Sequence, residues 1–299
     1  MRHFGPGVVE MAAREVQRIV HSQRMREGGG FIVRRPFPTE RLDHVDPFLL
    51  LDEMGPVEYG PGEAVGAPDH PHRGFETVTY MLDGEFEHED SAGNRGTIAA
   101  GDVQWMTAGD GVIHSEMPAA WIRERGGRVH GFQLWVNLPA RDKRIAPRYQ
   151  DVRAATMPTW RSDDGRATVK VIAGRALGVE GAAQTRIPIT YLDVALEKDA
   201  HVELDVPDLQ EAFVYVFGGA LTIGEQARAA GDGDMALLSH GDTLKLRATQ
   251  DGTRALVLAG QPIREPVARY GPFVMNTREE IYEAFTDFQS GRFGQITRS

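Results

Sequence analysis

The sequence predicts an all-β protein built from two tandem β-barrels. Short apolar runs rich in Val, Ile, Phe and Tyr recur along the chain, and each is bounded by Gly, Asp, Asn or Pro. Runs of this kind are typical of strands, and many short strands with frequent turn signals are typical of barrels and sandwiches. A length of 299 residues also suits two domains of ordinary size.

A weak internal repeat supports the division into two barrels. Residues 80–84 read YMLDG and are followed by a Gly-Asp turn at 101–102, whereas residues 215–219 read YVFGG and are followed by a Gly-Asp turn at 241–242. Both halves therefore show a strand, a tight turn, further strands and a second turn. We expect the first barrel over residues 1–145, the second over 146–270, and a helix with a tail over 271–299.

The sequence predicts one helix firmly, near the C-terminus. In NTREEIYEAFTDFQSG, Thr277 is followed three residues later by Glu280, which is the pattern of a capping box. Phe285 and Phe288 lie at helical spacing, and we expect them to pack across the two barrels. A second segment, residues 8–20, fits either a helix or, within EVQRIV, a strand.

Composition argues against several classes of function. The net charge is −10 and no basic block occurs, so binding to nucleic acid through a cationic face gains no support. The chain has no cysteine, which excludes disulfides, thiolate metal ligands and cysteine nucleophiles. No apolar run is long enough for a transmembrane helix, and the N-terminus lacks the pattern of a signal peptide. We therefore expect a cytoplasmic protein without a membrane partner.

Two pairs of polar residues in the first half predict a metal site. His70 and His72 are separated by one proline, and His114 and Glu116 are separated by one serine. Residues i and i+2 of a strand point to the same face, so each pair can direct two ligand atoms at one point. Three imidazoles and one carboxylate suit one divalent metal, with Fe(II) the leading choice and Mn, Ni, Cu, Co or Zn as alternatives.

An alternative fourth ligand is Glu76. It lies four residues after His72 and so has the strand parity of both histidines, although Gly74 can break that parity. Glu116 is favoured because His114 accompanies it.

The second half does not repeat these ligands. In an ungapped comparison, Asp205 and Pro207 occupy the places of the first pair, and Arg254 and Leu256 those of the second. The second barrel is therefore predicted to bind no metal.

Five stretches give the chain a resemblance to the pirin family. They read VDPFLLLDEMG, APDHPHRGFETVTYMLDG, GDVQWMTAGDGVIHSEMP, GFQLWVNLP and AGQPIREPVARYGPFVMNTREEIYEAFTDF. The resemblance runs from about residue 32 to about residue 293 and so covers nearly the whole chain. Pirins are bicupins, two cupin β-barrels in one chain with metal only in the first. The resemblance implies that iron is the usual metal and that His70, His72, His114 and Glu116 are its ligands.

The same resemblance implies two possible functions. Some pirins have quercetin 2,3-dioxygenase activity, in which O2 opens the central ring of a flavonol, and others bind transcription factors or metabolic enzymes as iron-dependent regulators. For an enzyme, we expect Glu116 to act as general base on the flavonol hydroxyl. Four further residues are predicted to line the substrate pocket: Arg73, Phe86, Gln133 and Leu134. For a regulator, we expect a protein partner in place of a substrate.

Overall fold

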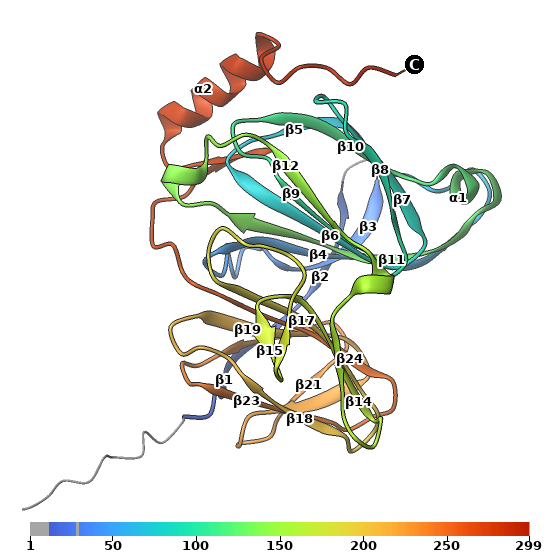
Figure 1. The fold of residues 1–299 in the computed structure, drawn as a ribbon, viewed down its shortest axis with the longest axis vertical. Coiled ribbons are helices and arrows are strands. Elements are labelled where there is room, and N and C mark those ends of the chain that lie inside the picture. Colours follow the sequence, from blue (N-terminus) through green and yellow to red (C-terminus); the bar gives the residue numbers. More distant parts are fainter. Residues whose placement is uncertain (1–11, 28–29, 299) are drawn as a thin grey trace, which may run out of the picture.

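The computed structural model describes residues 12–27 and 30–298, and it confirms two cupin barrels, one above the other in Figure 1. Each barrel pairs a larger sheet with a smaller one. The larger sheet of the first barrel contains, in spatial order, β12 (Arg148–Val152), β9 (Val103–Thr107), β6 (Phe75–Asp83), β11 (Gly127–Asn137), β4 (Phe48–Tyr59), β3 (Phe31–Phe37) and β2 (Gln23–Glu27). Its smaller sheet contains β5 (Ala67–His72), β10 (Val112–Pro118), β7 (Glu85–Asp90) and β8 (Arg95–Ala99).

The second barrel repeats this arrangement. Its larger sheet contains, in spatial order, β1 (Val16–His21), β22 (Asp234–Leu238), β19 (Glu211–Gly218), β24 (Thr253–Gly260), β17 (Ile189–Leu196), β14 (Ala167–Ala173) and β13 (Thr159–Arg161). Its smaller sheet contains β18 (His201–Asp205), β23 (Thr243–Ala248), β20 (Ala220–Ile223) and β21 (Arg228–Gly231). Two short hairpins, β15 (Arg175–Ala176) with β16 (Val179–Glu180) and β25 (Ala268–Tyr270) with β26 (Phe273–Met275), complete the strands.

The two barrels exchange edge strands, which differs from the boundary predicted at residue 145. Strand β1 precedes the first barrel in the sequence but pairs with β22 of the second. Strand β12 follows the predicted boundary but pairs with β9 of the first barrel. Each exchange covers a sheet edge that would otherwise expose unpaired backbone groups. Within the segment predicted as helix or strand, the described part is extended from Val16, and residues 8–11 lie outside the described residues.

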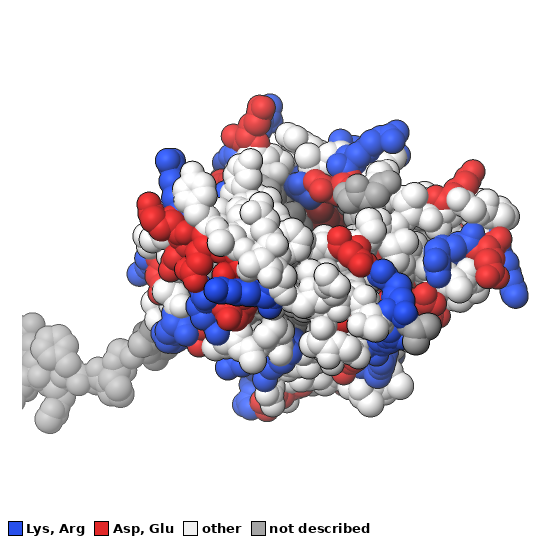
Figure 2. Space-filling model, turned by 90° about the horizontal axis from the view of Figure 1, so that it is seen from above, with Lys and Arg blue, Asp and Glu red and all other residues white. Residues whose placement is uncertain are grey.

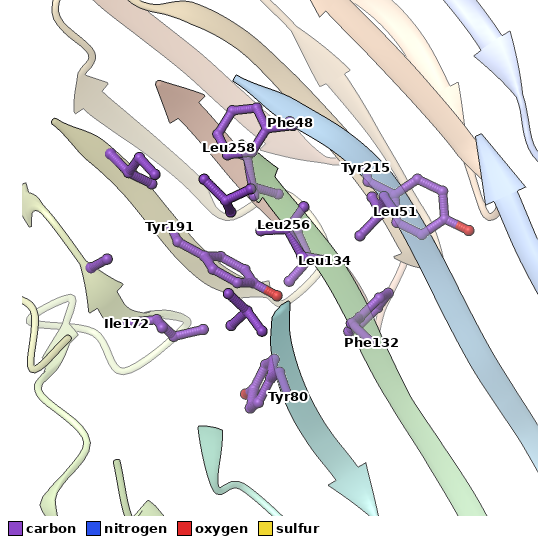
Figure 3. Packing of buried hydrophobic residues seen from close by; sticks show 14 of the residues in the cluster. Phe48, Leu51, Tyr80, Phe132, Leu134, Ile172, Tyr191, Tyr215, Leu256 and Leu258 are labelled. Carbon is purple, nitrogen blue, oxygen red and sulfur yellow. The ribbon is translucent and has the colours of Figure 1, made fainter. Parts of the chain in front are cut away.

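The largest apolar core lies between the barrels (Figure 3). One face of β4, β6 and β11 packs against one face of β17, β19 and β24. Their contributing side chains include Phe48, Leu51, Tyr80, Phe132, Leu134, Tyr191, Tyr215, Leu256 and Leu258. Because neighbouring residues of a strand alternate between faces, the other face of β6 and β11 is directed into the first barrel. The inter-barrel core therefore fixes the strands that form the interior of that barrel.

The predicted C-terminal helix is present as α2 (Arg278–Gln289), and its capping box is formed by Thr277 and Glu280 as expected. Its apolar face packs on the first barrel, where Phe285 and Phe288 surround Phe273 of β26. The expected packing across both barrels is corrected: the chain crosses back to the far end of the first barrel before α2 begins (Figure 1). A shorter helix, α1 (Ala120–Arg125), precedes β11.

The surface above the first barrel carries both signs of charge. Figure 2 shows basic and acidic side chains interspersed on this face, without a continuous basic patch. This pattern agrees with the absence of a basic block in the sequence. Among the described residues, no helix has the length and apolar character needed to cross a membrane.

Candidate metal centre

Three histidines converge inside the first barrel. His70 and His72 lie on β5, and His114 lies on the adjacent antiparallel strand β10 directly opposite His70. The ligand atoms of the three rings all lie within 4.8 Å of one another. The Nε2 atoms of His70 and His72 are 3.0 Å apart. One cation can therefore contact all three rings, and no other group of three or more such side chains is found among residues 12–27 and 30–298.

Burial suits these rings to metal binding. His72 and His114 are almost completely buried, and neither ring nitrogen of His114 has a hydrogen-bond partner among the described residues. An unpartnered buried polar group costs about 1–3 kcal/mol, which a bound cation would offset. Desolvation and, next, the neighbouring histidines hold the pKa of both rings well below the usual value. The rings are thus neutral, which is the form that coordinates metal.

Backbone carbonyls orient two of the rings. The Nδ1 atom of His70 lies 2.8 Å from the carbonyl oxygen of Pro68, and that of His72 lies 3.3 Å from the carbonyl oxygen of Pro272. A proton on Nδ1 that is donated to a carbonyl leaves Nε2 with its lone pair free. These contacts direct both Nε2 atoms to the point where the three rings meet.

Glu116 lies beside the three histidines, on the same strand as His114. The register of β10 with β5 shifts between these two residues, and Glu116 reaches the same cavity as His70 and His72. One of its carboxylate oxygens accepts a hydrogen bond of 2.8 Å from the hydroxyl of Thr79. Its oxygens are not part of the compact group that the three ring nitrogens form. Its role as fourth ligand therefore remains a proposal.

The alternative ligand Glu76 points away from this site. It opposes Thr107 of β9, whose hydroxyl donates a hydrogen bond of 2.6 Å to its carboxylate. Val78 and Tyr80, which share its face of β6, belong to the inter-barrel core. The cause is Gly74, whose φ of +88° interrupts the strand alternation after His72.

A cavity of about 570 Å³ opens from the histidines. Its apolar walls are Phe31, Leu50, Met54, Phe86 and Trp135. Its charged groups, apart from Glu116, are Glu27, Arg35, Asp52, Asp69 and Arg269. Burial raises the pKa of Asp52 to about 6, against the opposing effect of its ion pair with Arg35. The size and mixed character of the walls are typical of a small-molecule site.

Two of the four predicted pocket residues line this cavity, namely Phe86 and Gln133. Leu134 is fully buried in the inter-barrel core, because it has the opposite strand parity from Gln133. Arg73 is 2% exposed and donates to Asp287 of α2 over 2.9 Å. The structure thus places these last two side chains outside the cavity.

Sequence reasoning missed several cavity residues. Trp135 has the same parity as Gln133 on β11, so strict use of the strand alternation identifies it in place of Leu134. Asp52 shares a face of β4 with Leu50 and Met54, and the same argument applies to it. No local signal marks Arg269, which enters the first barrel from the end of the chain.

Comparisons with known proteins agree on the family. A family model described as pirin matches residues 30–136, and one described as the pirin C-terminal cupin domain matches residues 191–294. A pirin-like protein from Solanum lycopersicum is 42% identical over 94% of this chain and 93% of its own length. A pirin-like protein from Caulobacter vibrioides is 44% identical over 95% of this chain and 100% of its own length.

Among solved structures, a crystal structure of quercetin 2,3-dioxygenase from Acinetobacter baumannii superposes with a TM-score of 0.90. It is 41% identical in sequence, and the match covers 96% of this chain and 100% of the other. The likeness therefore extends over both barrels and α2.

Proposed function

The chain belongs to the pirin family, and from that premise we propose that it is a metal-dependent quercetin 2,3-dioxygenase acting on a flavonol or a related enol. The observation that supports this proposal best is the convergence of three imidazoles, two of them buried, beside a cavity of about 570 Å³. Such a donor set with an adjoining open space suits a metal that binds a substrate. The match to a quercetin 2,3-dioxygenase structure supports the choice of reaction.

The proposed cofactor is one divalent cation, Fe(II), held by His70, His72, His114 and Glu116. When bound, it would act as a Lewis acid toward the flavonol hydroxyl and lower the pKa of that group. The unpartnered nitrogens of His114 and the oriented Nε2 atoms of His70 and His72 fit this role.

Residues around the histidines would transfer the substrate proton, orient the carboxylate and position the substrate. Glu116 would take the proton of the flavonol 3-hydroxyl, because its carboxylate lines the same cavity as the rings. Thr79 would hold that carboxylate in place through its hydrogen bond. Phe86 and Trp135 would form apolar walls that position the aromatic rings and exclude water. The overall reaction consumes one O2, opens the central ring and releases carbon monoxide.

A turnover assay tests the proposal. The purified protein is loaded anaerobically in turn with Fe(II), Mn(II), Ni(II), Cu(II), Co(II) and Zn(II), and the loss of quercetin absorbance and the release of carbon monoxide are followed after O2 is added. We expect turnover with Fe(II) that is lost in His72→Ala and Glu116→Gln. The matched control is Glu76→Gln, which removes a carboxylate that belongs to the first barrel but points away from the site. This variant should retain turnover. Absence of turnover with all six metals contradicts the proposal and favours an iron-dependent binding protein.

A further inference from the structure

The hairpin of β25 and β26 brings residues from the end of the chain into the wall of the cavity. Arg269, Gly271 and Pro272 all line it. The carbonyl oxygen of Pro272 lies 3.3 Å from Nδ1 of His72. The same hairpin thus supports one of the histidines and places a guanidinium in the cavity.

The guanidinium of Arg269 has spare hydrogen-bonding capacity. It lies over the ring of Trp135, 4.8 Å from the ring centre, and one terminal nitrogen donates to the carbonyl oxygen of Leu49 over 3.1 Å. A guanidinium carries five N–H donors, so most of them remain available. Within the described part of the chain, no carboxylate lies within ion-pair distance of it. Burial and, next, the neighbouring Arg35 lower the pKa of Arg269, and the carboxylates of Asp43, Asp52 and Glu27 offset this lowering only in part.

The other arginine of the cavity is already neutralised. Arg35 donates two hydrogen bonds, of 2.6 and 2.5 Å, to the carboxylate of Asp52. A second carboxylate, that of Glu27, lies 2.7 Å from its remaining terminal nitrogen. A ligand would have to break these ion pairs in order to bind Arg35, whereas Arg269 requires no such exchange. Arg269 is therefore the group best able to bind an acidic oxygen of a ligand.

Trp135 connects Arg269 to the histidines. Its ring centre lies 5.3 Å from that of His72 and 4.8 Å from the guanidinium carbon of Arg269. The separation of the guanidinium from the His72 ring therefore cannot exceed the sum of these two distances. All three side chains line the same cavity, so a flat aromatic ligand with one end at the histidines can extend past Trp135 and present its other end to Arg269.

We propose that Arg269 is a specificity-determining residue that binds an acidic phenolic oxygen on the part of the substrate remote from the histidines. The substrate class is then a polyhydroxylated flavonol, and a flavonol without hydroxyls on its outer rings is a poor ligand. This inference rests on the proposed function, because it assumes that the flavonol 3-hydroxyl lies at the metal end. Arginine suits this role because its planar, stacked guanidinium is held by Trp135 before the ligand arrives.

Equilibrium binding without turnover tests the inference. The Fe(II)-loaded protein is titrated under anaerobic conditions with quercetin, which has phenols on both outer rings, and with 3-hydroxyflavone, which has none. A hydrogen bond to a charged group contributes about 1.5–3 kcal/mol, so Arg269→Gln should weaken quercetin binding roughly tenfold or more. Binding of 3-hydroxyflavone should change less than about twofold. Arg269→Lys should restore part of the lost affinity.

The matched control is Arg278→Gln, which removes the same charge from the exposed first residue of α2. It should leave both affinities unchanged. Equal weakening of both ligands by Arg269→Gln, or no weakening of either, overturns the inference. Failure of the inference is separable from failure of the proposed function, because the wild-type protein can turn over quercetin with O2 whether or not Arg269 discriminates between the two ligands.

Discussion

The hydroxyl of Thr79 on β6 donates a hydrogen bond of 2.8 Å to the carboxylate of Glu116 on β10. The bond joins the larger sheet of the first barrel to the smaller one, across the interior. The amide oxygen of Gln133 lies 2.7 Å from the same hydroxyl, on the cavity side. Since a hydroxyl has one proton, Thr79 can serve only one of these oxygens at a time, and Gln133 competes with Glu116 for it.

Thr79→Val is therefore expected to weaken catalysis more than stability. Valine keeps the shape of the side chain but cannot orient Glu116, and loss of a residue that orients a metal ligand typically costs about 10–100-fold in affinity or activity. Metal content after dialysis, kcat for quercetin and thermal unfolding should be measured together. A variant with unchanged kcat and unchanged metal content contradicts the positioning role.

Glu116→Gln and Glu76→Gln form a matched pair that decides which carboxylate serves the metal. Both side chains belong to the first barrel, but only that of Glu116 lines the cavity, whereas Glu76 accepts from Thr107 on the opposite face of β6. Competition with a metal-sensitive dye should show affinity for Fe(II) lowered at least about tenfold by Glu116→Gln. Affinity in Glu76→Gln should equal that of the wild type. If Glu76→Gln lowered the affinity for Fe(II) and Glu116→Gln did not, Glu76 would be the fourth ligand.

Two buried tyrosines of the inter-barrel core should respond differently to loss of the hydroxyl. The hydroxyl of Tyr215 donates a hydrogen bond of 2.6 Å to the fully buried carboxylate of Glu53, whereas that of Tyr191 has no partner among the described residues. Tyr215→Phe should lower the free energy of unfolding by about 1.5–3 kcal/mol, because the bond is to a charged group. Tyr191→Phe should be neutral or stabilising. Urea denaturation of the two variants measures the difference, and equal effects would contradict the assigned contacts.

Lys143 should make stability depend on pH in the alkaline range. Lys143 is 1% exposed, and its ammonium donates hydrogen bonds to Asn137, Gly74 and Val274. Burial lowers its pKa from 10.5 to about 8. Between pH 8 and pH 10.5, Lys143 binds a proton more fully in the unfolded chain than in the folded one. Its contribution to the free energy of unfolding therefore increases as pH rises from 8 to 10.5 and is complete above 10.5. The contribution is lost as pH falls through 8.

The test for Lys143 compares the wild type with Lys143→Met by urea denaturation from pH 7 to 10.5. The free energy of unfolding of the wild type should rise relative to that of the variant by up to about 3 kcal/mol. A constant difference across this range would mean that the pKa of Lys143 is the same in both states.

The sequence predicted the parts of this protein that local patterns determine. The capping box of α2 needs only Thr277 and Glu280, and the convergence of His70 and His72 needs only the alternation of a strand. The two-barrel fold followed from recurrent strands and turns. The family resemblance and the accompanying His114 together favoured Glu116 over Glu76, and the structure shows Glu76 on the opposite face of β6.

Contacts between residues far apart in the sequence could not be predicted from local patterns. The exchange of β1 and β12 between barrels depends on which sheet edges remain open after folding. Arg269 lies 197 residues from His72 in the sequence, and only the return of the chain to the first barrel brings them to one cavity. The prediction that both Gln133 and Leu134 line the pocket conflicts with strand alternation, which directs Leu134 into the inter-barrel core. The prediction that Arg73 lines the pocket is also wrong, because its side chain is directed to Asp287 of α2, 214 residues away in the sequence.

Anomalous diffraction from iron-loaded crystals tests the metal centre most directly. Data collected on either side of the iron absorption edge should show one peak per chain, within coordinating distance of ring nitrogens of His70, His72 and His114 and of a carboxylate oxygen of Glu116. The second barrel should show no peak. An absence of iron between the three histidines, or iron bound only elsewhere in the chain, would contradict the account.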